Sequence, residues 1–245
     1  MRGETPALRN FSLRIEQGEH VAILGPNGSG KSSFIKAITR ECYPLQGSTL
    51  KILGRERWNI FELRSHLGIV TNDWMLACSR DYTGRETVLS GFFSSVGLWP
   101  YHLVTPEMDA EADKIIRFLE VEHLAARNVS EMSSGEARRF LIGRALVHNP
   151  QTLIFDEPTN SLDLHAMRKL HAAMRQIAQA GKSVVLVTHT LQDIIPEIDR
   201  VVMIQDGQVF FDGPKAEALT DDRLSTLFQS PVEVQARNGV FHALY

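Results

Sequence analysis

The segment Gly25-Pro26-Asn27-Gly28-Ser29-Gly30-Lys31-Ser32 matches the phosphate-binding pattern G-x-x-x-x-G-K-[ST] at every position. The run Val21-Ala22-Ile23-Leu24 before it is typical of a buried strand, and residues 33–38 after it carry apolar side chains at helical spacing. Because glycine tolerates unusual backbone angles and close approach, successive N–H groups of such a loop can converge on phosphate oxygens where the helix begins. Lys31 supplies a positive charge and Ser32 a hydroxyl for magnesium. The segment therefore predicts a strand, a phosphate loop and a helix that together bind a nucleoside triphosphate.

A chance match is the alternative interpretation of this segment. At ordinary glycine content the pattern arises in roughly one chain in a hundred of this length. The strand before the loop and the helix after it make a coincidence rarer, so we favour the functional interpretation.

The composition is that of an ordinary globular protein. Of the 245 residues, 43% are hydrophobic and 22% are charged, so the chain can bury a substantial core. The 26 basic and 29 acidic residues give a formal net charge of −3, so no overall positive field attracts nucleic acid. We therefore expect no nucleic-acid partner.

Signals for secretion or membrane insertion are missing from the sequence. The first residues lack the apolar core of a signal peptide, and nowhere do about 18 apolar residues follow one another. Cys42 and Cys78 have neither the spacing of a metal site nor that of a redox motif. We expect a cytoplasmic protein that reaches the inner face of the cell membrane only through a partner.

The order of apolar and amphipathic segments predicts an α/β fold. In the second half of the chain, short apolar runs alternate with helical patterns, which is typical of a mainly parallel sheet flanked by helices. We expect a single domain over residues 1–245, with a small antiparallel β subdomain near the N-terminus, a helical subdomain at about 80–148 and a hairpin at about 230–245, where Asn238-Gly239 marks the turn. The strand candidates are 11–15, 21–24, 48–53, 67–70, 152–155, 184–187 and 201–204, and the helix candidates are 33–38, 110–119, 136–146, 165–179 and 191–195.

Two adjacent carboxylates follow the strand candidate at 152–155. Because ligands of such folds bind at the carboxyl ends of parallel strands, Asp156 can hold magnesium through water, and Glu157 can orient or deprotonate an attacking water. Alternatively, the two carboxylates only cap the segment Pro158-Thr159-Asn160. We favour the catalytic interpretation, because paired charges at a buried strand end would otherwise incur a desolvation cost.

The order of these motifs resembles the nucleotide-binding domain of ATP-binding cassette (ABC) proteins, a family of P-loop NTPases, from about Ala7 to Gly213. The segment from Gly25 to Ser32 is similar to the Walker A loop of that family, and Thr152 to Asp156 is similar to its Walker B strand. Met132-Ser133-Ser134-Gly135-Glu136 resembles the family signature, usually written LSGGQ, and Ser161-Leu162-Asp163 resembles the D-loop. A phosphate loop alone occurs in many enzymes, whereas this combination points to one family.

The resemblance implies an ATPase that uses ATP and Mg²⁺. Glu157 would be the catalytic carboxylate, and His189 stands where the family has the switch histidine that contacts the γ-phosphate. The remaining contacts are carried over motif by motif. Nucleotide contacts are implied for Gly25, Pro26, Asn27, Gly28, Ser29, Gly30, Lys31, Ser32, Ser33 and Asn72, and metal contacts for Ser32, Asp156 and Asn72.

The resemblance also implies a head-to-tail homodimer that forms on ATP binding. Each phosphate loop would face the partner's signature residues, and Asp163 would be the D-loop residue. The signature set is Ser133, Ser134, Gly135 and Glu136. Because these residues open a helix, their amides can form a second anion site. Ser133 and Glu136 also fit a capping box, which is a structural role compatible with the first.

The sequence departs from the family pattern in three respects. Asn72 replaces the usual glutamine and keeps the amide on a side chain one methylene shorter, so turnover is expected to be slow. In the signature, Ser134 replaces a glycine, and Met132 and Glu136 replace the leucine and the glutamine, which are mild changes that keep Ser133 and Gly135. The aromatic residue that stacks on adenine has no counterpart upstream of Phe11, so we expect either a start before Met1 or a relaxed base preference.

The leading hypothesis for the function is the energising subunit of a membrane transporter, with a separate transmembrane partner, and an importer because the cassette is a chain of its own. Within the family, the signature run, the Phe92-Phe93 segment and the hairpin look most similar to molybdate-import or photorepair-type cassettes. If the aromatic segment 88–101 receives the membrane partner, then Phe92, Phe93 or Trp99 should be exposed. The alternatives are a soluble ATPase acting on a nucleic-acid or protein complex, and a nucleotide-responsive scaffold with low turnover.

Overall fold

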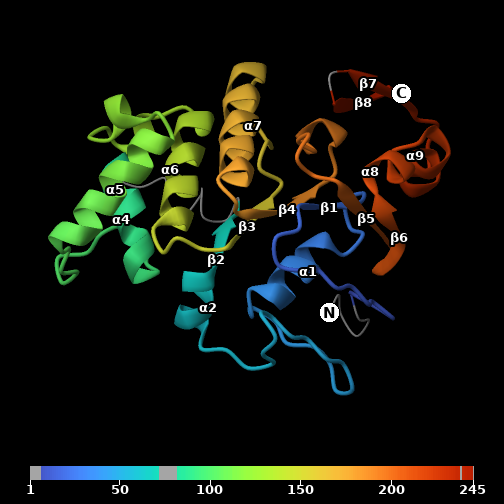
Figure 1. Cartoon of the computed structure of the whole chain (residues 1–245), viewed down its shortest axis with the longest axis horizontal. Helices are drawn as coiled ribbons and strands as arrows, with labels where there is room; N and C mark the ends of the chain where they lie inside the picture. The colour runs from blue at the N-terminus through green and yellow to red at the C-terminus, as the bar shows by residue number, and fades with distance from the viewer. Residues whose placement is uncertain (1–6, 72–81, 238, 245) are drawn as a thin grey trace. The chain divides into compact units, whose positions relative to one another are not determined.

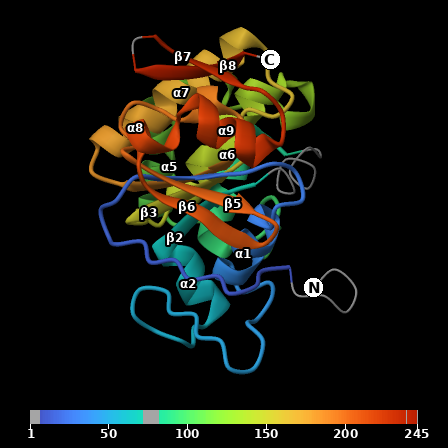
Figure 2. The same cartoon turned by 90° about the vertical axis from the view of Figure 1, so that its right-hand side faces the viewer.

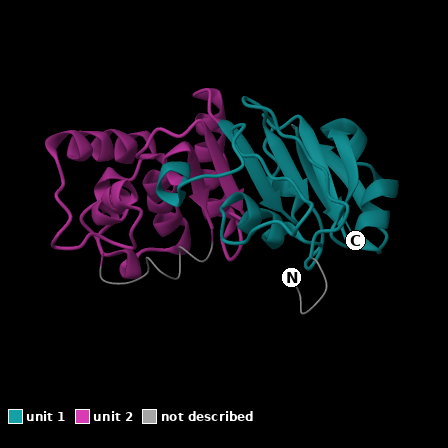
Figure 3. Ribbon diagram, turned by 90° about the horizontal axis from the view of Figure 1, so that it is seen from below, with its two compact units in different colours: residues 1–63, 183–245 teal, residues 64–182 magenta. Residues whose placement is uncertain are grey.

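The computed structural model describes residues 7–71, 82–237 and 239–244 (Figure 1, Figure 2). These residues form two compact units (Figure 3). Unit 1 comprises residues 1–63 and 183–245, and unit 2 comprises residues 64–182. The chain passes from unit 1 to unit 2 within helix α2, Ile60–His66, and returns between Lys182 and Ser183.

Unit 1 is built on four strands in the order β4-β1-β5-β6. The first three are parallel, and β6 runs antiparallel to β5. All four residues of β1 are 0% exposed, which explains why that strand is apolar at every position rather than at alternate ones. The bounds are β1 Val21–Leu24, β4 Ser183–Thr188, β5 Arg200–Gln205 and β6 Gln208–Pro214.

The helices of unit 1 follow the strand ends. Helix α1 leaves the phosphate loop, and the short helices α8 and α9 connect β6 to a C-terminal hairpin (Figure 1). That hairpin pairs β7 with β8 in antiparallel register, from Glu233 opposite Leu244 to Arg237 opposite Val240, as predicted. The bounds are α1 Lys31–Ile38, the 3-10 helix η4 Leu191–Asp193, α8 Lys215–Ala218, α9 Asp221–Phe228, β7 Glu233–Arg237 and β8 Val240–Leu244.

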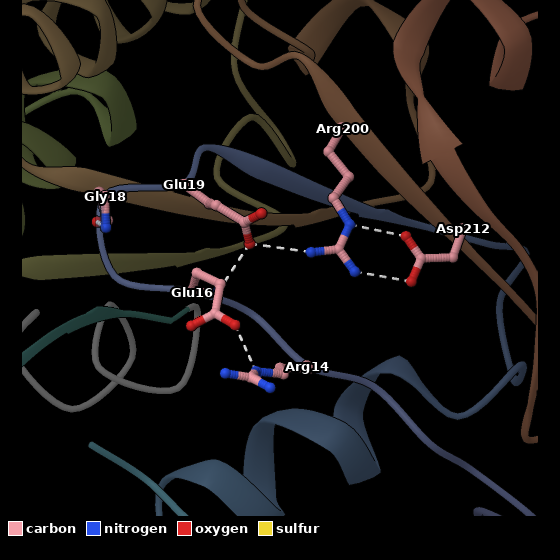
Figure 4. Close-up of polar contacts among 7 residues, drawn as sticks. Arg14, Glu16, Gly18, Glu19, Arg200 and Asp212 are labelled. Carbon is pink, nitrogen blue, oxygen red and sulfur yellow. Dashed lines mark hydrogen bonds and ion pairs between the residues drawn. The ribbon is translucent and has the colours of Figure 1, made fainter. Parts of the chain in front are cut away.

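A charged network joins the turn before β1 to strands β5 and β6 (Figure 4). Arg200 makes a bidentate contact with Asp212, at 2.7 Å for both pairs of atoms, and its Nη1 lies 2.9 Å from Oε2 of Glu19. The same Glu19 oxygen accepts the N–H of Glu16 at 2.8 Å, and Glu16 pairs with Arg14. The hydrogen bond from Arg200 to Asp212 raises the pKa of the guanidinium, so Arg200 keeps its positive charge in this network.

Unit 2 packs helices around the parallel pair β2-β3, in which Leu67 lies opposite Thr152 and Val70 opposite Phe155. Helix α6 is buried almost all round, because it contacts α4, α5, α7 and β2. The predicted helical segment at about 80–148 contains α4, α5 and α6 and lies within this unit. The bounds are β2 Leu67–Val70, α4 Gly84–Ser90, η1 Gly91–Phe93, α5 Pro106–Phe118, η2 Glu122–Leu124, η3 Val129–Glu131, α6 Ser134–Leu146, β3 Thr152–Asp156 and α7 Leu164–Gln179.

Among the described residues, the predicted small antiparallel β subdomain near the N-terminus is not formed. Residues 11–15 alternate in exposure as a strand would, yet they pair with no neighbouring strand, and Phe11 packs its ring on Phe34 of α1 instead. Residues 48–53 contain a single bridge, between Ile52 and Arg55, in a tight turn. Side-chain alternation alone cannot make a strand, because the backbone groups need a partner ladder.

Substitution of Phe140 tests the packing of unit 2. This side chain is 0% exposed and packs so closely on Gly84 that a β-carbon there would lie 2.6 Å from the ring. Phe140→Ala should lower the free energy of unfolding by about 3–5 kcal/mol, measured by urea denaturation. Phe118→Ala, at a side chain 38% exposed on α5, is the control and should cost about 1 kcal/mol or less. Equal losses in the two variants would contradict this packing.

Candidate nucleotide-binding and catalytic site

The phosphate loop connects β1 to α1 in the predicted manner. Gly28 and Gly30 have φ angles of 87° and 117°, in the region that favours glycine, and Gly30 is the N-cap of α1. The Lys31 side chain folds back beneath the loop, where its Nζ donates to the carbonyl oxygens of Gly25 at 2.8 Å and Pro26 at 3.1 Å. These two hydrogen bonds hold the ammonium group inside the curve of the loop.

Close packing at two glycines of the loop leaves no room for side chains. A β-carbon at Gly25 would lie 2.4 Å from the carbonyl oxygen of Ile204, and one at Gly30 would lie 2.8 Å from Cδ2 of Leu8. The hydroxyl of Ser29 is buried and has no hydrogen-bond partner among the described residues. A glycine-lined loop with an unsatisfied hydroxyl and a cation fits the phosphates of a nucleotide.

The switch histidine lies at the same sheet edge as this loop. Strands β1 and β4 are parallel neighbours, and Leu24 pairs with Thr188. Gly25 and His189 are the next residues of the two strands, so the first residue of the phosphate loop and His189 leave the edge side by side. The structure thus brings together two predicted site regions that are more than 150 residues apart in the chain.

The predicted catalytic carboxylates lie at the end of β3 in unit 2. Asp156 is the last residue of the strand, and Glu157 follows with a φ of 46°, which is uncommon for a residue other than glycine. The Asn160 side-chain amide donates to Oε2 of Glu157 at 2.5 Å. This contact holds the carboxylate in a defined orientation. Asn72 lies outside the described residues.

The signature segment opens helix α6 with the expected capping box. The Ser133 hydroxyl accepts the N–H of Glu136 at 3.3 Å, and the Glu136 carboxylate accepts the N–H of Ser133 at 2.8 Å. The bond from the Ser133 backbone, followed by that from its hydroxyl, lowers the pKa of Glu136. The cap therefore stabilises α6 at neutral pH, and this contribution is lost as the pH falls through the lowered pKa. Ser133 and Ser134 are exposed, so the helix end remains open to a ligand.

Helix α6 is docked against the loop that follows Glu157. The Arg138 guanidinium is 4% exposed and donates to the carbonyl oxygens of Pro158 and Asn160, the latter at 3.3 Å. The Ser134 hydroxyl donates to the carbonyl oxygen of Ser161 at 3.3 Å. The signature segment and the D-loop therefore form one connected surface of unit 2.

The D-loop residue Asp163 has a visible structural role. Its Oδ1 accepts the N–H of Ala166 at 2.8 Å and caps helix α7. Gly135 lies close to the same turn, since a β-carbon there would lie 2.5 Å from Cβ of Ala166. Glycine at this position allows α6 and α7 to approach each other.

Arg138 and Asn160 were not among the predicted site residues. Both act on the loop that carries Glu157, as described above. The sequence signal for Arg138 is its place among the apolar residues of the helix at 136–146. In the structure this helix is almost fully buried, so the guanidinium needs buried acceptors. Asn160 is the last residue of the Pro158-Thr159-Asn160 segment, and it contacts the Glu157 side chain, whose backbone has a positive φ.

The sequence model described as "ABC transporter" matches residues 8–160, more than half of the chain. The chain belongs to the ABC transporter family. It is an ABC ATPase, a cassette that binds and hydrolyses ATP. An uncharacterized ABC transporter ATP-binding protein of Bacillus subtilis is 32% identical over 232 residues, which cover 93% of this chain and 87% of that protein.

Two further proteins with descriptive names are similar to this cassette. The hemin import ATP-binding protein of Nocardia farcinica is 32% identical over 240 residues, which cover 95% of this chain and 80% of that protein. A solved dimeric ATP-binding cassette in a post-hydrolysis state, bound to ADP and phosphate, is 27% identical with a TM-score of 0.68 and covers 85% of this chain and 90% of that chain.

The segment of chain that connects α4 to α5 carries three exposed apolar side chains, Trp99, Tyr101 and Leu103, which we call the aromatic surface. These side chains are 44%, 74% and 82% exposed, and the rings of Trp99 and Tyr101 stack with centroids 6.5 Å apart. The predicted exposure is therefore confirmed for Trp99, whereas Phe92 and Phe93 are half-buried. Within the described part of the chain, no helix is both long enough and apolar enough to span a bilayer.

Substitution of Gly30 tests the shape of the phosphate loop. An alanine there must adopt a φ of 117° and displace Leu8, so Gly30→Ala should weaken ATP binding by about tenfold or more, measured by calorimetric titration. Gly47→Ala is the matched control, because Gly47 also has a positive φ, of 87°, but its β-carbon would meet nothing within 4 Å. Equal ATP affinity in both variants would contradict this description of the loop.

Proposed function

We propose that this cassette energises a membrane importer by hydrolysing Mg-ATP at a site that two copies of the chain complete together. The observation that carries the proposal is the pairing of Leu24 with Thr188, which sets the phosphate loop and His189 at one sheet edge of unit 1. The contacts between Glu157, Asn160 and α6 in unit 2 support the second half of the proposal.

Within this proposal the phosphates bind at the positive end of α1. The amides of the loop from Gly25 to Ser33 surround the β- and γ-phosphates, and the Lys31 ammonium neutralises part of their charge. Ser32, Asp156 and Asn72 would hold Mg²⁺, for which hydroxyl, carboxylate and amide oxygens are suitable ligands. When bound, the ion would supply positive charge to the phosphate oxygens.

Glu157 accepts the proton of the attacking water, and His189 contacts the γ-phosphate. The positive φ of Glu157 and the hydrogen bond from Asn160 support this role, because both restrict the direction of the carboxylate. Catalysis then comes from positioning and electrostatic stabilisation.

The second anion site explains why two copies are needed. The N-terminus of α6 is exposed at Ser133 and Ser134 and offers amides and a helix dipole to an anion. The phosphates of the chain's own nucleotide already have such a site at the phosphate loop, so this second site needs another source of phosphate. We assign these residues, with Gly135 and Glu136, to the γ-phosphate held by the partner copy, in a head-to-tail homodimer. The dimer bound to ADP and phosphate among the similar structures supports this arrangement.

The transport role is supported by the relatives and by the aromatic surface. The sequence of the hemin-import relative aligns with this chain over most of the length of both proteins. Large exposed aromatic side chains are typical of protein interfaces, and Trp99, Tyr101 and Leu103 offer a site for a separate transmembrane subunit. The cassette would then act at the inner face of the cell membrane.

Glu157→Gln tests the assigned base. The amide cannot take a proton but keeps the shape of the side chain, so phosphate release should fall on the order of 100-fold or more, while ATP affinity stays within about twofold. Glu122→Gln, at an exposed glutamate of the same unit, is the control and should retain the wild-type rate. Undiminished hydrolysis by Glu157→Gln would rule out the assignment.

Tyr101→Ser/Leu103→Ser tests the aromatic surface. These substitutions remove the most exposed apolar groups of the surface, so recovery of a multi-span membrane protein with the tagged cassette should fall by about tenfold. Leu53→Ser/Phe61→Ser, at side chains 45% and 68% exposed in unit 1, is the control and should leave recovery unchanged. Recovery of an RNA or of a soluble complex in place of a membrane protein would contradict the transport role.

A further inference from the structure

The C-terminal hairpin is fastened to helix α9 by two side chains. The Ser225 hydroxyl accepts the N–H of Val232 at 2.9 Å, just before β7. Oδ1 of Asp221 accepts the N–H of Val234 at 2.8 Å, within β7. Val232 is 4% exposed and anchors the start of the hairpin in the core of unit 1. The hairpin therefore has a defined place in the unit.

The other strand of the hairpin lies against the segment that follows His189. Strand β8, labelled in Figure 1, contacts η4, which begins two residues after His189. The turn at Gly239 lies beside Pro196. The segment is buried, since Leu191 is 3% exposed and Ile194 is 0% exposed. The connection from β4 to β5 is thus covered rather than left as a surface loop.

A buried hydroxyl ties the two sides of His189 together. The Thr188 hydroxyl donates to Oδ2 of Asp193 at 2.7 Å and accepts the N–H of Thr190 at 3.0 Å. Thr188 and Asp193 are each 1% exposed. Any displacement of η4 would pull on Asp193, and through Thr188 would change the direction in which the His189 backbone leaves the sheet.

We propose that the C-terminal hairpin positions His189, by holding η4 and the Thr188–Asp193 pair in place while the γ-phosphate is cleaved. This inference rests on the proposed function of His189 at that phosphate. The hairpin is a positioning element, because it acts on His189 through η4 and not on the nucleotide. It should therefore affect the rate of the chemical step more than the binding of ATP.

Removal of the hairpin is the first test. A chain that ends at Val232 keeps the buried anchor and loses both strands. Its kcat for ATP hydrolysis should fall by about three- to tenfold, while KM for ATP changes by less than about twofold. Thermal unfolding and circular dichroism of the same preparation check that the shortened chain is folded.

A second pair of variants loosens the hairpin without removing it, so that the proposal can be tested if the shortened chain does not fold. Asp221→Ala/Ser225→Ala removes the two side-chain anchors and should lower kcat in the same manner. Asp221→Asn in the otherwise unchanged chain keeps an oxygen that accepts the Val234 N–H, so its kcat should stay close to that of the wild type. Asp222→Ala, at the neighbouring acid, removes the same charge without removing a hydrogen bond to the hairpin that is seen among the described residues, and should also retain kcat.

The outcomes separate this inference from the proposed function. If the wild-type chain hydrolyses ATP and the folded variants without the hairpin or its anchors keep the full kcat, the hairpin does not position His189. A loss of ATP binding with unchanged kcat would also overturn the inference, because it would place the hairpin's effect on the ground state. If the wild-type chain shows no hydrolysis at all, the proposed function itself fails.

Discussion

The central constraint on this fold is that the backbone amides of the phosphate loop must converge on the negatively charged oxygens of a triphosphate. The amides at the start of α1 can face the phosphates only if the loop before them turns sharply, and that turn requires the positive φ angles of Gly28 and Gly30. Residues on either side of the loop hold it in this shape. Strand β1, fully buried between β4 and β5, fixes one end, and the Lys31 ammonium beneath the loop bonds to its carbonyl oxygens.

A helix N-terminus that can face an anion occurs a second time in unit 2, where Ser133 is the N-cap of α6. This second helix N-terminus is exposed, and its capping box stabilises the first turn of the helix without covering it. Buried Arg138 and the hydroxyl of Ser134 connect this helix to the loop after Glu157. The same hydrogen bonds therefore support the signature residues, which we assign to the partner's nucleotide, and Glu157, which we assign to the attacking water.

Much of this could be predicted from the sequence because the decisive signals are local. The phosphate loop, the strand that ends at Asp156, the capping box at Ser133 and the Asn238-Gly239 hairpin each rest on a few adjacent residues, and the expected elements are present in the structure. The predicted antiparallel N-terminal subdomain has no counterpart among the described residues, because alternation at 11–15 says nothing about whether a partner strand lies alongside. Strand β6 was missed, although Asp206-Gly207 before it is a hairpin turn signal.

The contacts that position the site were beyond prediction for a different reason. The bonds from Arg138 to Pro158 and from Asn160 to Glu157 depend on tertiary docking and on a left-handed residue that no local pattern requires. The Thr188–Asp193 pair depends in turn on the path of η4 under the hairpin. Residues of this kind become visible only when the fold has placed them.

The central claim is that one copy's phosphate loop works with the other copy's signature helix, and mixing two inactive variants tests it most directly. Lys31→Ala removes the loop cation, and Ser134→Glu places a negative charge where the partner's γ-phosphate would lie. Head-to-tail pairing predicts that an equal mixture recovers about a quarter of the wild-type hydrolysis rate, because half of the dimers are mixed and each mixed dimer holds one intact site. A mixture as inactive as the separate variants would contradict the shared site.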